Sequence, residues 1–391
     1  MDTKAHTLQK VSDLKALTIA PYQFLPASSG GQKAVYYLDQ FLGDQLGLIC
    51  VSSSDNELKH LPEPLRFTLL PLLGRGRGRY LNPAHFFTLK KLIKQKNIGV
   101  IIIEHPYLSW LGWLLKITTG KPLIIRSHNI EALRFKDLGK WWWRILADYE
   151  RWAHRRASHS FFITEQDADY AVNSYGIKRA DTSVITYGMD LKNALTPAKK
   201  QAATTAFKTQ LGVPESHTLL LFNGIFGYPP NDEALRLLLE QIYPALLAKD
   251  PYFHLVVCGQ NIPEKYKTGA PKQCTILGFV PDIKAVFEGA EVFLNPIWLG
   301  GGIKTKLVEA LASGCAAVSF NTGAIGIPAT LLAGKLLLTE DGDIDGFVEA
   351  TMRARDRSLQ PIQQAFLDYF DWNLIAQKAY KAIEALDHKS L

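Results

Sequence analysis

The 391-residue sequence predicts an α/β protein of two doubly wound domains, each a parallel sheet with helices on both faces. Two observations lead to this prediction. Short apolar, β-branched runs alternate with longer segments of helical apolar spacing, such as "PNDEALRLLLEQIYPALLAK". Several of the apolar runs are nearly continuous, which is typical of strands that are buried on both faces.

Ten strands are expected, five in each half of the chain. The N-terminal half offers "LKALTIAPY", "LGLICVS", "NIGVIIIEH", "KPLIIRSH" and "SHSFFITE". The C-terminal half offers "HTLLLFNG", "FHLVVCGQ", "CTILGFV", "AEVFLNPI" and "CAAVSFN". Between the halves lies a polar stretch rich in alanine and lysine, "LKNALTPAKKQAATTAFKTQLGVPESH", which indicates a domain boundary.

We therefore assign residues 1–190 to an N-terminal domain and 191–365 to a C-terminal domain. Residues 366–391 are expected to form a helix that packs back toward the N-terminal domain. Doubly wound sheets bind ligands beyond the carboxyl ends of their strands, so we expect a site in a cleft where the two domains face each other.

The composition narrows the partners without choosing one. With 44 basic and 37 acidic residues, the net charge of +7 favours anionic ligands, anionic lipid surfaces or nucleic acid. The four cysteines are scattered and form no C-x-x-C pair, so we expect buried free thiols in a reducing compartment and no metal site. The N-terminus lacks the apolar core of a signal peptide, and no apolar run is long enough to span a bilayer. A cytoplasmic location is therefore expected.

The stretch "NPIWLGGGIKTKLVEALASG", residues 295–314, places three glycines before a helix-forming segment. Glycines allow positive φ and close approach of a ligand to the backbone. A helix that opens after such a loop offers free N–H groups at the positive end of its dipole, and Lys304 and Lys306 add charge there. This combination favours a phosphate group, although an ordinary strand-to-helix turn with solvated lysines fits the residues equally well.

Read together with its neighbours, this stretch resembles the nucleotide-sugar site of group 1 (family four) glycosyltransferases of the GT-B fold, which has two Rossmann-like domains. Other segments agree in order, among them "PYQFLPASSGGQKAVYYLDQFL", "IIRSHNIEALRF", "LLFNGIFGYPPNDEAL" and "LGFVPDIKAVFEGAEVFLNPI". The resemblance begins near residue 17 and is weakest between residues 50 and 95.

The resemblance implies a metal-independent hexosyltransferase that uses a nucleotide-diphosphate sugar, UDP- or GDP-linked, and needs no cofactor. Its catalytic candidates are His128, Lys306 and Glu309. Glu309 matches the carboxylate that binds the ribose hydroxyls of the donor; otherwise it is an exposed helix residue paired with Lys306. Lys306, with Lys304 as the second candidate, would neutralise the diphosphate as the glycosidic bond breaks.

The sequence departs from the family pattern at two places. Many members carry a Glu-x7-Glu pair, but Gly301 stands where the first glutamate is expected, so the backbone of Gly301 and Gly302 would contact the donor sugar. The basic residues usual after the first strand of the C-terminal domain are absent, and that strand ends at Asn223 and Gly224. These departures suggest a branch with the pattern GGGxKxK.

The remaining candidates also follow from the resemblance. Gly30 and Gly31 would let the backbone of the N-terminal domain approach the diphosphate or the acceptor, and Phe279 and Val280 would lie at the nucleobase. His128 matches a histidine that contacts the donor sugar or phosphates, or else it caps its strand. For Glu131 and Arg134, which follow it, a solvated surface position is favoured over a contact with the acceptor.

The segment "GKWWWRILADYERWAHRRASHS", residues 139–160, combines four tryptophans with five basic residues. It could lie on an anionic membrane and serve a lipid-linked acceptor, or pack one aromatic face on the sheet with a basic outer face. We favour the packed helix.

The expected function is retaining transfer of a sugar to a glycan or glycolipid, in surface polysaccharide or glycoconjugate synthesis, without a nucleic-acid partner. One alternative is a GT-B epimerase or hydrolase, which would need added acidic or histidine catalytic groups that the sequence does not reveal. Another is a non-catalytic basic protein that binds membranes or nucleic acid through residues 74–79 and 139–156.

Overall fold

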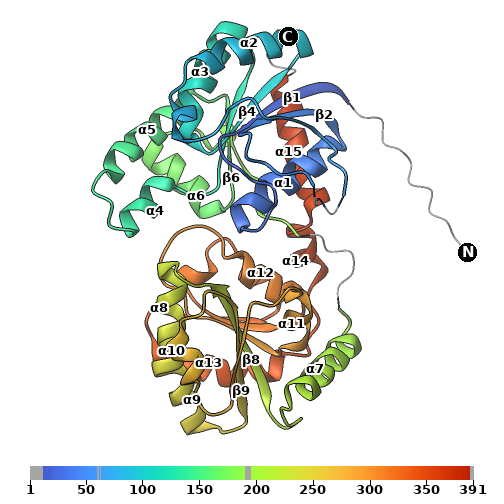
Figure 1. Cartoon of the computed structure of the whole chain (residues 1–391), viewed down its shortest axis with the longest axis vertical. Coiled ribbons are helices and arrows are strands. Elements are labelled where there is room, and N and C mark those ends of the chain that lie inside the picture. The colour runs from blue at the N-terminus through green and yellow to red at the C-terminus, as the bar shows by residue number, and fades with distance from the viewer. Residues whose placement is uncertain (1–11, 60, 62, 190–194, 388–391) are drawn as a thin grey trace, which may run out of the picture. The chain divides into compact units, whose positions relative to one another are not determined.

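The computed structural model describes residues 12–59, 61, 63–189 and 195–387. The chain forms two compact units: unit 1 comprises residues 1–188 and 370–391, and unit 2 comprises residues 189–369. Each unit is built around one parallel sheet with helices on its faces (Figure 1). Every strand pair in both sheets is parallel, as the continuous apolar runs predict.

Unit 1 has a seven-stranded sheet in the order β3-β2-β1-β4-β5-β6-β7. Its strands are β1 (Ser12–Ala20), β2 (Leu46–Ser52), β3 (Thr68–Leu70), β4 (Val100–Glu104), β5 (Leu123–Ser127), β6 (His159–Phe162) and β7 (Thr182–Val184). Its helices are α1 (Gly30–Gly43), α2 (Ala84–Lys96), α3 (Ser109–Thr119), α4 (Glu131–Asp137), α5 (Trp143–Arg156), α6 (Glu165–Tyr170) and α15 (Trp372–Asp387).

Unit 2 repeats this topology with six strands in the order β10-β9-β8-β11-β12-β13. They are β8 (Thr218–Ile225), β9 (Phe253–Gln260), β10 (Cys274–Gly278), β11 (Val292–Asn295), β12 (Ala316–Phe320) and β13 (Leu336–Thr339). The helices are α7 (Pro197–Leu211), α8 (Pro229–Leu237), α9 (Tyr243–Lys249), α10 (Glu264–Thr268), α11 (Ile283–Gly289), α12 (Thr305–Ala312), α13 (Ile344–Ala354) and α14 (Gln364–Tyr369). In both sheets the chain reverses its direction of winding at the first strand, which is the switch point where such folds bind ligands.

All ten predicted strands are present, and three others were missed. The missed strands β3, β7 and β13 have three, three and four residues, and each lies at an edge of its sheet. Strands this short carry too few residues for a periodic signal.

The C-terminal helix α15 belongs to unit 1 and packs on α1 (Figure 1). Its first residue, Trp372, is fully buried and stacks on Tyr37 of α1 with 5.9 Å between ring centroids. Gly188 lies against the same indole, so closely that a Cβ at this position would come within 2.4 Å of a ring atom. The absence of a side chain at residue 188 therefore permits the packing of α15.

The four cysteines are free thiols, as the sequence predicts. Cys50, Cys258 and Cys315 are buried, whereas Cys274 is half-buried. Among the described residues, no helix combines the length and the apolar character needed to cross a bilayer.

Candidate active site

In unit 2 the three glycines lie in the loop between β11 and α12. Gly300 has φ 79° and Gly302 has φ 73°, which is the left-handed region that favours glycine. Gly301 does not need this conformation, and a Cβ there would meet no atom within 4 Å. The loop thus owes its path to Gly300 and Gly302, while Gly301 leaves open space above its backbone.

Lys304 closes this loop on itself. It stands directly before α12, and its ammonium donates to the carbonyl oxygens of Gly300, Gly301 and Gly302 at 2.7, 3.0 and 3.1 Å. These bonds hold three carbonyls that have no partner in a helix or strand. The charge of Lys304 therefore stabilises the loop.

Lys306 turns instead toward the carboxyl end of β8. Its ammonium donates to the backbone oxygen of Asn223 at 2.7 Å and to Oδ1 of Asn231 at 2.9 Å. The Nζ atom also lies 4.6 Å from the ring centroid of Phe222. Burial lowers the pKa of Lys306 to about 7, and the charge of Lys304 contributes to the shift. The structure therefore brings Lys306 and Asn223, which are 83 positions apart, to one place.

Close backbone packing leaves little room for side chains at the ends of β8 and β9. A Cβ on Gly259 would lie 1.8 Å from the carbonyl oxygen of Gly224, and a Cβ on Gly224 would lie 3.1 Å from the Asn231 side chain. The side-chain oxygen of Asn223 is buried, and no described group bonds to it. This edge of the sheet thus presents backbone atoms, one orphaned amide oxygen and the ammonium of Lys306.

The other unit 2 candidates lie at the carboxyl end of β10 and on α12. Phe279, which follows β10, is 64% exposed although it is a large apolar residue. Val280 beside it is half-buried. Glu309 is half-buried on α12, three residues after Lys306 and therefore on the same helix face.

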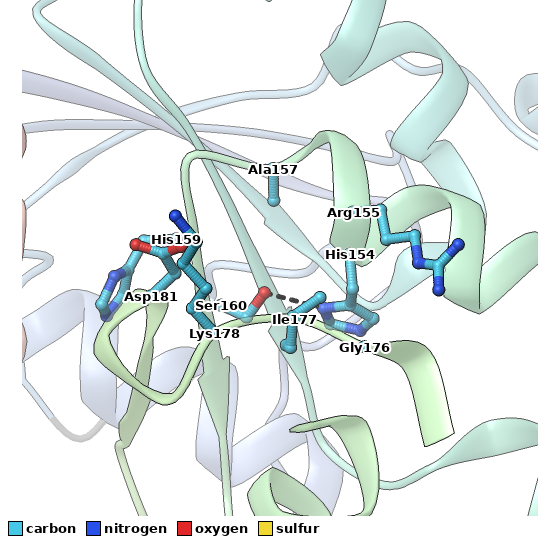
Figure 2. A pocket seen from close by; sticks show the side chains of 9 residues that line it. All are labelled: His154, Arg155, Ala157, His159, Ser160, Gly176, Ile177, Lys178 and Asp181. Carbon is cyan, nitrogen blue, oxygen red and sulfur yellow. Dashed lines mark hydrogen bonds between the residues drawn. The ribbon is translucent and has the colours of Figure 1, made fainter. Parts of the chain in front are cut away.

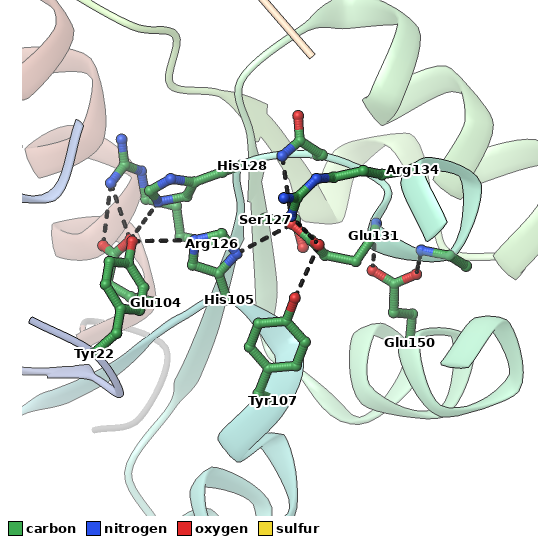
Figure 3. Close-up of polar contacts among 12 residues, drawn as sticks. Tyr22, Glu104, His105, Tyr107, Arg126, Ser127, His128, Glu131, Arg134 and Glu150 are labelled. Carbon is green, nitrogen blue, oxygen red and sulfur yellow. Dashed lines mark hydrogen bonds and ion pairs between the residues drawn. The ribbon is translucent and has the colours of Figure 1, made fainter. Parts of the chain in front are cut away.

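In unit 1, His128 follows β5 and belongs to a buried polar cluster (Figure 3). Its Nε2 lies 2.7 Å from Oε2 of Glu104, the last residue of β4. Arg126 donates from one guanidinium nitrogen to both Glu104 oxygens, at 3.2 and 3.1 Å. Glu104 is 1% exposed and Arg126 is fully buried.

The charged groups in this cluster shift the pKa values of their neighbours. Burial alone would raise the pKa of Glu104, but Arg126 and His128 outweigh it and lower that pKa to about 2. Burial lowers the pKa of His128 to about 3, and the neighbouring His105 and Arg126 act in the same direction. The cluster therefore contains an ionised carboxylate, a guanidinium and a neutral imidazole.

A second carboxylate extends the cluster from His105 to α4. Glu131 accepts from the hydroxyl of Tyr107 at 2.8 Å and from Arg134 at 3.0 Å, and it lies 3.5 Å from Nδ1 of His105. The expectation of a solvated position for Glu131 is wrong, because its side chain is fully buried. Arg134 is partly exposed, so the arginine is the member of this ion pair that reaches solvent.

Glu150 and Tyr22 hold the start of α4 and the side chain of His105 in place. The carboxylate of Glu150 on α5 accepts from the backbone N–H groups of Glu131 and Ala132, which are the first two residues of α4 (Figure 3). The hydroxyl of Tyr22 lies 3.1 Å from Nε2 of His105. His105 adopts φ 60°, an uncommon conformation for a non-glycine residue, at the carboxyl end of β4.

Gly30 and Gly31 are the first residues of α1, after the N-cap Ser29. Ser29 and Gln32 form a capping box, so this helix start satisfies part of its backbone with its own side chains. A Cβ on Gly31 would meet no atom within 4 Å. The backbone is therefore open at Gly31, as it is at Gly301 in unit 2.

A pocket of about 200 Å³ lies elsewhere, at the amino end of β6 (Figure 2). It is lined by His154, Arg155, Ala157, His159, Ser160, Gly176, Ile177, Lys178 and Asp181, and none of these was a candidate. Both ring nitrogens of His154 are bonded, to the hydroxyls of Ser127 and Ser160. Because its buried polar groups are satisfied and it lies at the opposite end of the strands from His128, this pocket is a poor candidate for the site.

The two basic segments are partly packed. In residues 74–81, Arg75 and Arg79 form ion pairs with Asp55. In residues 139–160, Trp152 packs against the apolar core of unit 1, whereas Trp141 is 83% exposed. The segment therefore contains both a packed aromatic face and an exposed one.

Sequence reasoning missed Glu104, His105, Tyr107 and Arg126. The signal was present, because charged residues end the apolar runs "IIIEH" and "IIRSH". The carboxyl ends of neighbouring parallel strands meet at one sheet edge, and these residues lie together because β4 and β5 are neighbours in the sheet. Unit 1 therefore holds a cluster of acidic and histidine side chains that the sequence did not reveal. In the described part of the chain, no group of three or more His, Cys, Asp or Glu residues is arranged to hold a metal ion.

Comparison with known proteins agrees with this architecture. A family model described as "Glycosyltransferase Family 4" matches residues 33–193, and one described as "Glycosyl transferases group 1" matches residues 217–356. No curated protein matches the chain in sequence.

Solved structures of the same fold cover nearly the whole chain. Sucrose-phosphate synthase from Thermosynechococcus elongatus is 16% identical with a TM-score of 0.71, over 96% of this chain and 100% of that one. HepE from Anabaena in complex with UDP is 15% identical with a TM-score of 0.68, over 95% and 100%. A glycosyltransferase from Rickettsia africae is 14% identical with a TM-score of 0.67, over 96% and 98%. These likenesses establish the GT-B fold.

The two family models together cover most of both units, and both models describe glycosyltransferases. The chain is a group 1 glycosyltransferase.

Proposed function

We propose that this glycosyltransferase moves a hexosyl group from a UDP- or GDP-sugar to a glycan or glycolipid acceptor, with retention of configuration and without a metal ion. We place it in surface polysaccharide or glycoconjugate synthesis and in a branch with the pattern GGGxKxK. The observation that carries this proposal is the ammonium of Lys306, held between α12 and the end of β8. An enclosed cation beside a helix start and a glycine loop suits a diphosphate.

The groups around Lys306 supply the rest of a donor site. The open backbone at Gly301 and its neighbour Gly302 would admit the phosphates and the donor sugar. Glu309, one helical turn after Lys306, would accept from the ribose hydroxyls, and the exposed Phe279 with Val280 would contact the base. HepE was solved with UDP and with UDP-glucose, which supports a UDP-sugar as the donor.

The same groups would act on the leaving group. As the glycosidic bond breaks, negative charge grows on the departing diphosphate, and Lys306 with the first N–H groups of α12 would stabilise that charge. By resemblance to the retaining family members, the departing diphosphate would then take the proton of the acceptor hydroxyl. By the same resemblance, the buried cluster around His128 in unit 1 would contact a sugar.

Calorimetric titration with UDP, GDP, ADP and CMP tests the donor assignment. We expect UDP or GDP to bind, and Glu309→Ala to weaken that binding by about 10–100-fold, because two hydroxyl bonds to a carboxylate are lost. Glu349→Ala, which removes an exposed carboxylate on α13 that pairs with Lys249, is the control and should leave the Kd unchanged. An unchanged Kd for Glu309→Ala would contradict the ribose role.

We also infer that unit 1 touches the inner, anionic face of a membrane, where a lipid-linked acceptor would lie. Trp141 is 83% exposed and Ile145 is 66% exposed, and basic side chains flank them. Lys136 and Arg144 lie over the ring of Trp143, at 5.2 and 5.4 Å from its centroid. Exposed apolar groups beside cations are typical of interfacial segments.

Sedimentation with vesicles of phosphatidylglycerol or phosphatidylcholine tests the membrane contact. We expect binding to the anionic vesicles alone, and a severalfold loss in the double variant Trp141→Ser, Ile145→Ser. Leu359→Ser, which removes an exposed leucine of unit 2, is the matched control. Equal sedimentation of the double variant and the control would refute the contact.

A further inference from the structure

Arg126, Glu104 and His128 of unit 1 are buried and contact one another in series, and the series ends at a ring nitrogen without a described hydrogen-bond partner. Arg126 donates to both oxygens of Glu104, and Oε2 of Glu104 lies 2.7 Å from Nε2 of His128 (Figure 3). The other ring nitrogen of His128, Nδ1, is buried and bonds to no described group. All three residues sit at the carboxyl ends of β4 and β5, where the fold binds ligands.

Donor and acceptor rules fix the protons along this chain. A guanidinium has only donors, and its charge beside both Glu104 oxygens favours the ionised carboxylate, which accepts from Arg126. An ionised carboxylate has only acceptors, so the Nε2 atom of His128 must carry the proton of the 2.7 Å bond. If the imidazole is neutral, Nδ1 carries no proton and is a hydrogen-bond acceptor.

The charge balance of the cluster keeps the imidazole neutral. One guanidinium already neutralises Glu104, and a protonated His128 would add a second cation within the same buried space. The ring centroids of His105 and His128 lie 4.1 Å apart, and His105 contacts Tyr22 and Glu131. Glu131 is already engaged by Tyr107 and Arg134 and so offers His128 no compensating charge. Burial accordingly lowers the pKa of His128 to about 3.

We propose that Glu104, anchored by Arg126, is a positioning residue that fixes His128 in the tautomer whose Nδ1 accepts a hydrogen bond from a sugar hydroxyl. This inference rests on the proposed function for the nature of the substrate. A buried acceptor without a partner is costly, and a hydroxyl donor relieves that cost on binding.

The tautomer selects the chemistry that His128 recognises. A diphosphate at neutral pH presents only acceptor oxygens, which cannot donate to an unprotonated Nδ1. A sugar hydroxyl can donate, so His128 binds a hydroxyl of the donor sugar or of the acceptor. It does not bind the phosphates, which we assign to unit 2. The sequence had left both contacts open.

Two substitutions of His128 separate its two nitrogens. The amide of asparagine reaches the position of Nδ1, and the longer amide of glutamine reaches the position of Nε2. If Nδ1 binds a hydroxyl, His128→Asn keeps an acceptor there and should retain a kcat/KM at least about tenfold above that of His128→Gln. The reverse order would overturn the proposal, because it would mean that the contact with Glu104 alone matters.

Nitrogen-15 NMR of histidine-labelled protein reads the tautomer directly, with the His128 signals assigned by their loss in His128→Asn. We expect wild-type His128 to be neutral, with a protonated Nε2 and an unprotonated Nδ1, at pH 7. In Glu104→Gln the amide can donate to Nε2, so the proton should move toward Nδ1 and kcat/KM should fall about tenfold or more, with the Kd for UDP unchanged. A charged or Nδ1-protonated ring in the wild type would overturn the proposal.

Glu104→Gln leaves Arg126 without its counter-charge and so risks misfolding. The wild-type spectrum and the His128 pair do not depend on that variant and keep the proposal open to refutation. The spectrum also does not depend on which sugar is transferred. The expected tautomer in a protein that transfers no sugar would therefore overturn the proposed function and not the positioning of His128.

Discussion

The two units place opposite kinds of polar group at the ends of similar sheets. In unit 2 the loop before α12 offers backbone N–H groups and two ammonium groups, all from residues close together in the chain. In unit 1 the cluster offers two carboxylates, two histidines and two guanidinium groups, drawn from α4 and from the carboxyl ends of β4 and β5. The first set suits an anion, and the second suits a neutral group that both donates and accepts hydrogen bonds.

The difference also concerns how each set is held. Lys306 and Lys304 donate to backbone carbonyl oxygens, and in the loop Gly300 is partly exposed and Gly301 is exposed. A ligand can therefore replace these bonds at little cost. Glu104 and Arg126 are buried and bonded to each other, and the buried Glu131 is bonded to Tyr107 and Arg134. These groups therefore keep one geometry whether or not a ligand is bound. We therefore expect substitutions in unit 2 to change ligand affinity and turnover, and substitutions in unit 1 to change stability as well.

The largest expected effect tests the charge in unit 2. Lys306→Met should lower kcat by about 10²–10³-fold, because the growing charge on the diphosphate loses its enclosed cation. The binding of the free nucleoside should stay close to that of the wild type. Steady-state kinetics with titration of uridine and UDP would measure both, and equal losses for the two ligands would contradict the phosphate role.

A buried carboxyl of unit 1 provides the next test. Asp39 of α1 is 1% exposed, and burial, with Glu104 as the second cause, raises its pKa from 3.8 to about 8. Because the folded pKa lies above the unfolded one, this group contributes stability that is complete below pH 3.8 and is lost as pH rises to 8.

Between pH 5 and pH 7 the free energy of unfolding should therefore fall by at most about 3 kcal/mol through Asp39. Asp39→Asn cannot ionise and should remove this slope, so its stability relative to wild type should rise with pH. Denaturant unfolding at both pH values measures the difference between the two proteins. Parallel pH profiles would mean that Asp39 is ionised in the folded state.

The pH dependence of donor binding tests the charge of Lys306 in unit 2, as the pH dependence of stability tests Asp39 in unit 1. The pKa of Lys306 is lowered to about 7, so its charge disappears as pH rises above 7. The affinity for UDP should weaken by up to about tenfold per pH unit from pH 7 to pH 8, whereas Lys306→Met should show a flat profile. Calorimetry at the two pH values is the measurement, and a wild-type profile as flat as that of the variant would exclude Lys306 as the titrating group.

The smallest effect separates two adjacent glycines. Gly300→Ala must hold an alanine at φ 79° and should cost about 1–2 kcal/mol of stability. Gly301→Ala needs no such conformation and meets no atom, so its melting temperature should match the wild type while UDP-sugar binding weakens. Thermal unfolding and calorimetry on both variants would show this crossed pattern; equal melting temperatures for the two variants would contradict it.

Local residue order predicted much of this protein. The alternation of apolar runs with helical segments was enough for ten of the thirteen strands in the described chain, and the missed strands are edge strands of three or four residues. The glycine loop and α12 were predictable because positive φ, helix propensity and the lysine charges are properties of neighbouring residues.

The partners of the functional side chains were not predictable in the same way. The sequence analysis favoured a solvated surface position for Glu131, yet Glu131 is fully buried and contacts Tyr107 and His105. Likewise, Lys306 reaches Asn223 across 83 positions of the chain, and Arg126 reaches Glu104 across 22. Such contacts depend on which strands lie side by side in the sheet.

By itself, then, the order of residues determined the fold class, the family and the glycine loop, because apolar periodicity and local backbone preference act over a few residues. Only the tertiary structure decided which nitrogen of His128 bonds to no described group and where the charge of Lys306 lies. Those properties arise from burial and from charges on other elements, and both are set when the sheets assemble.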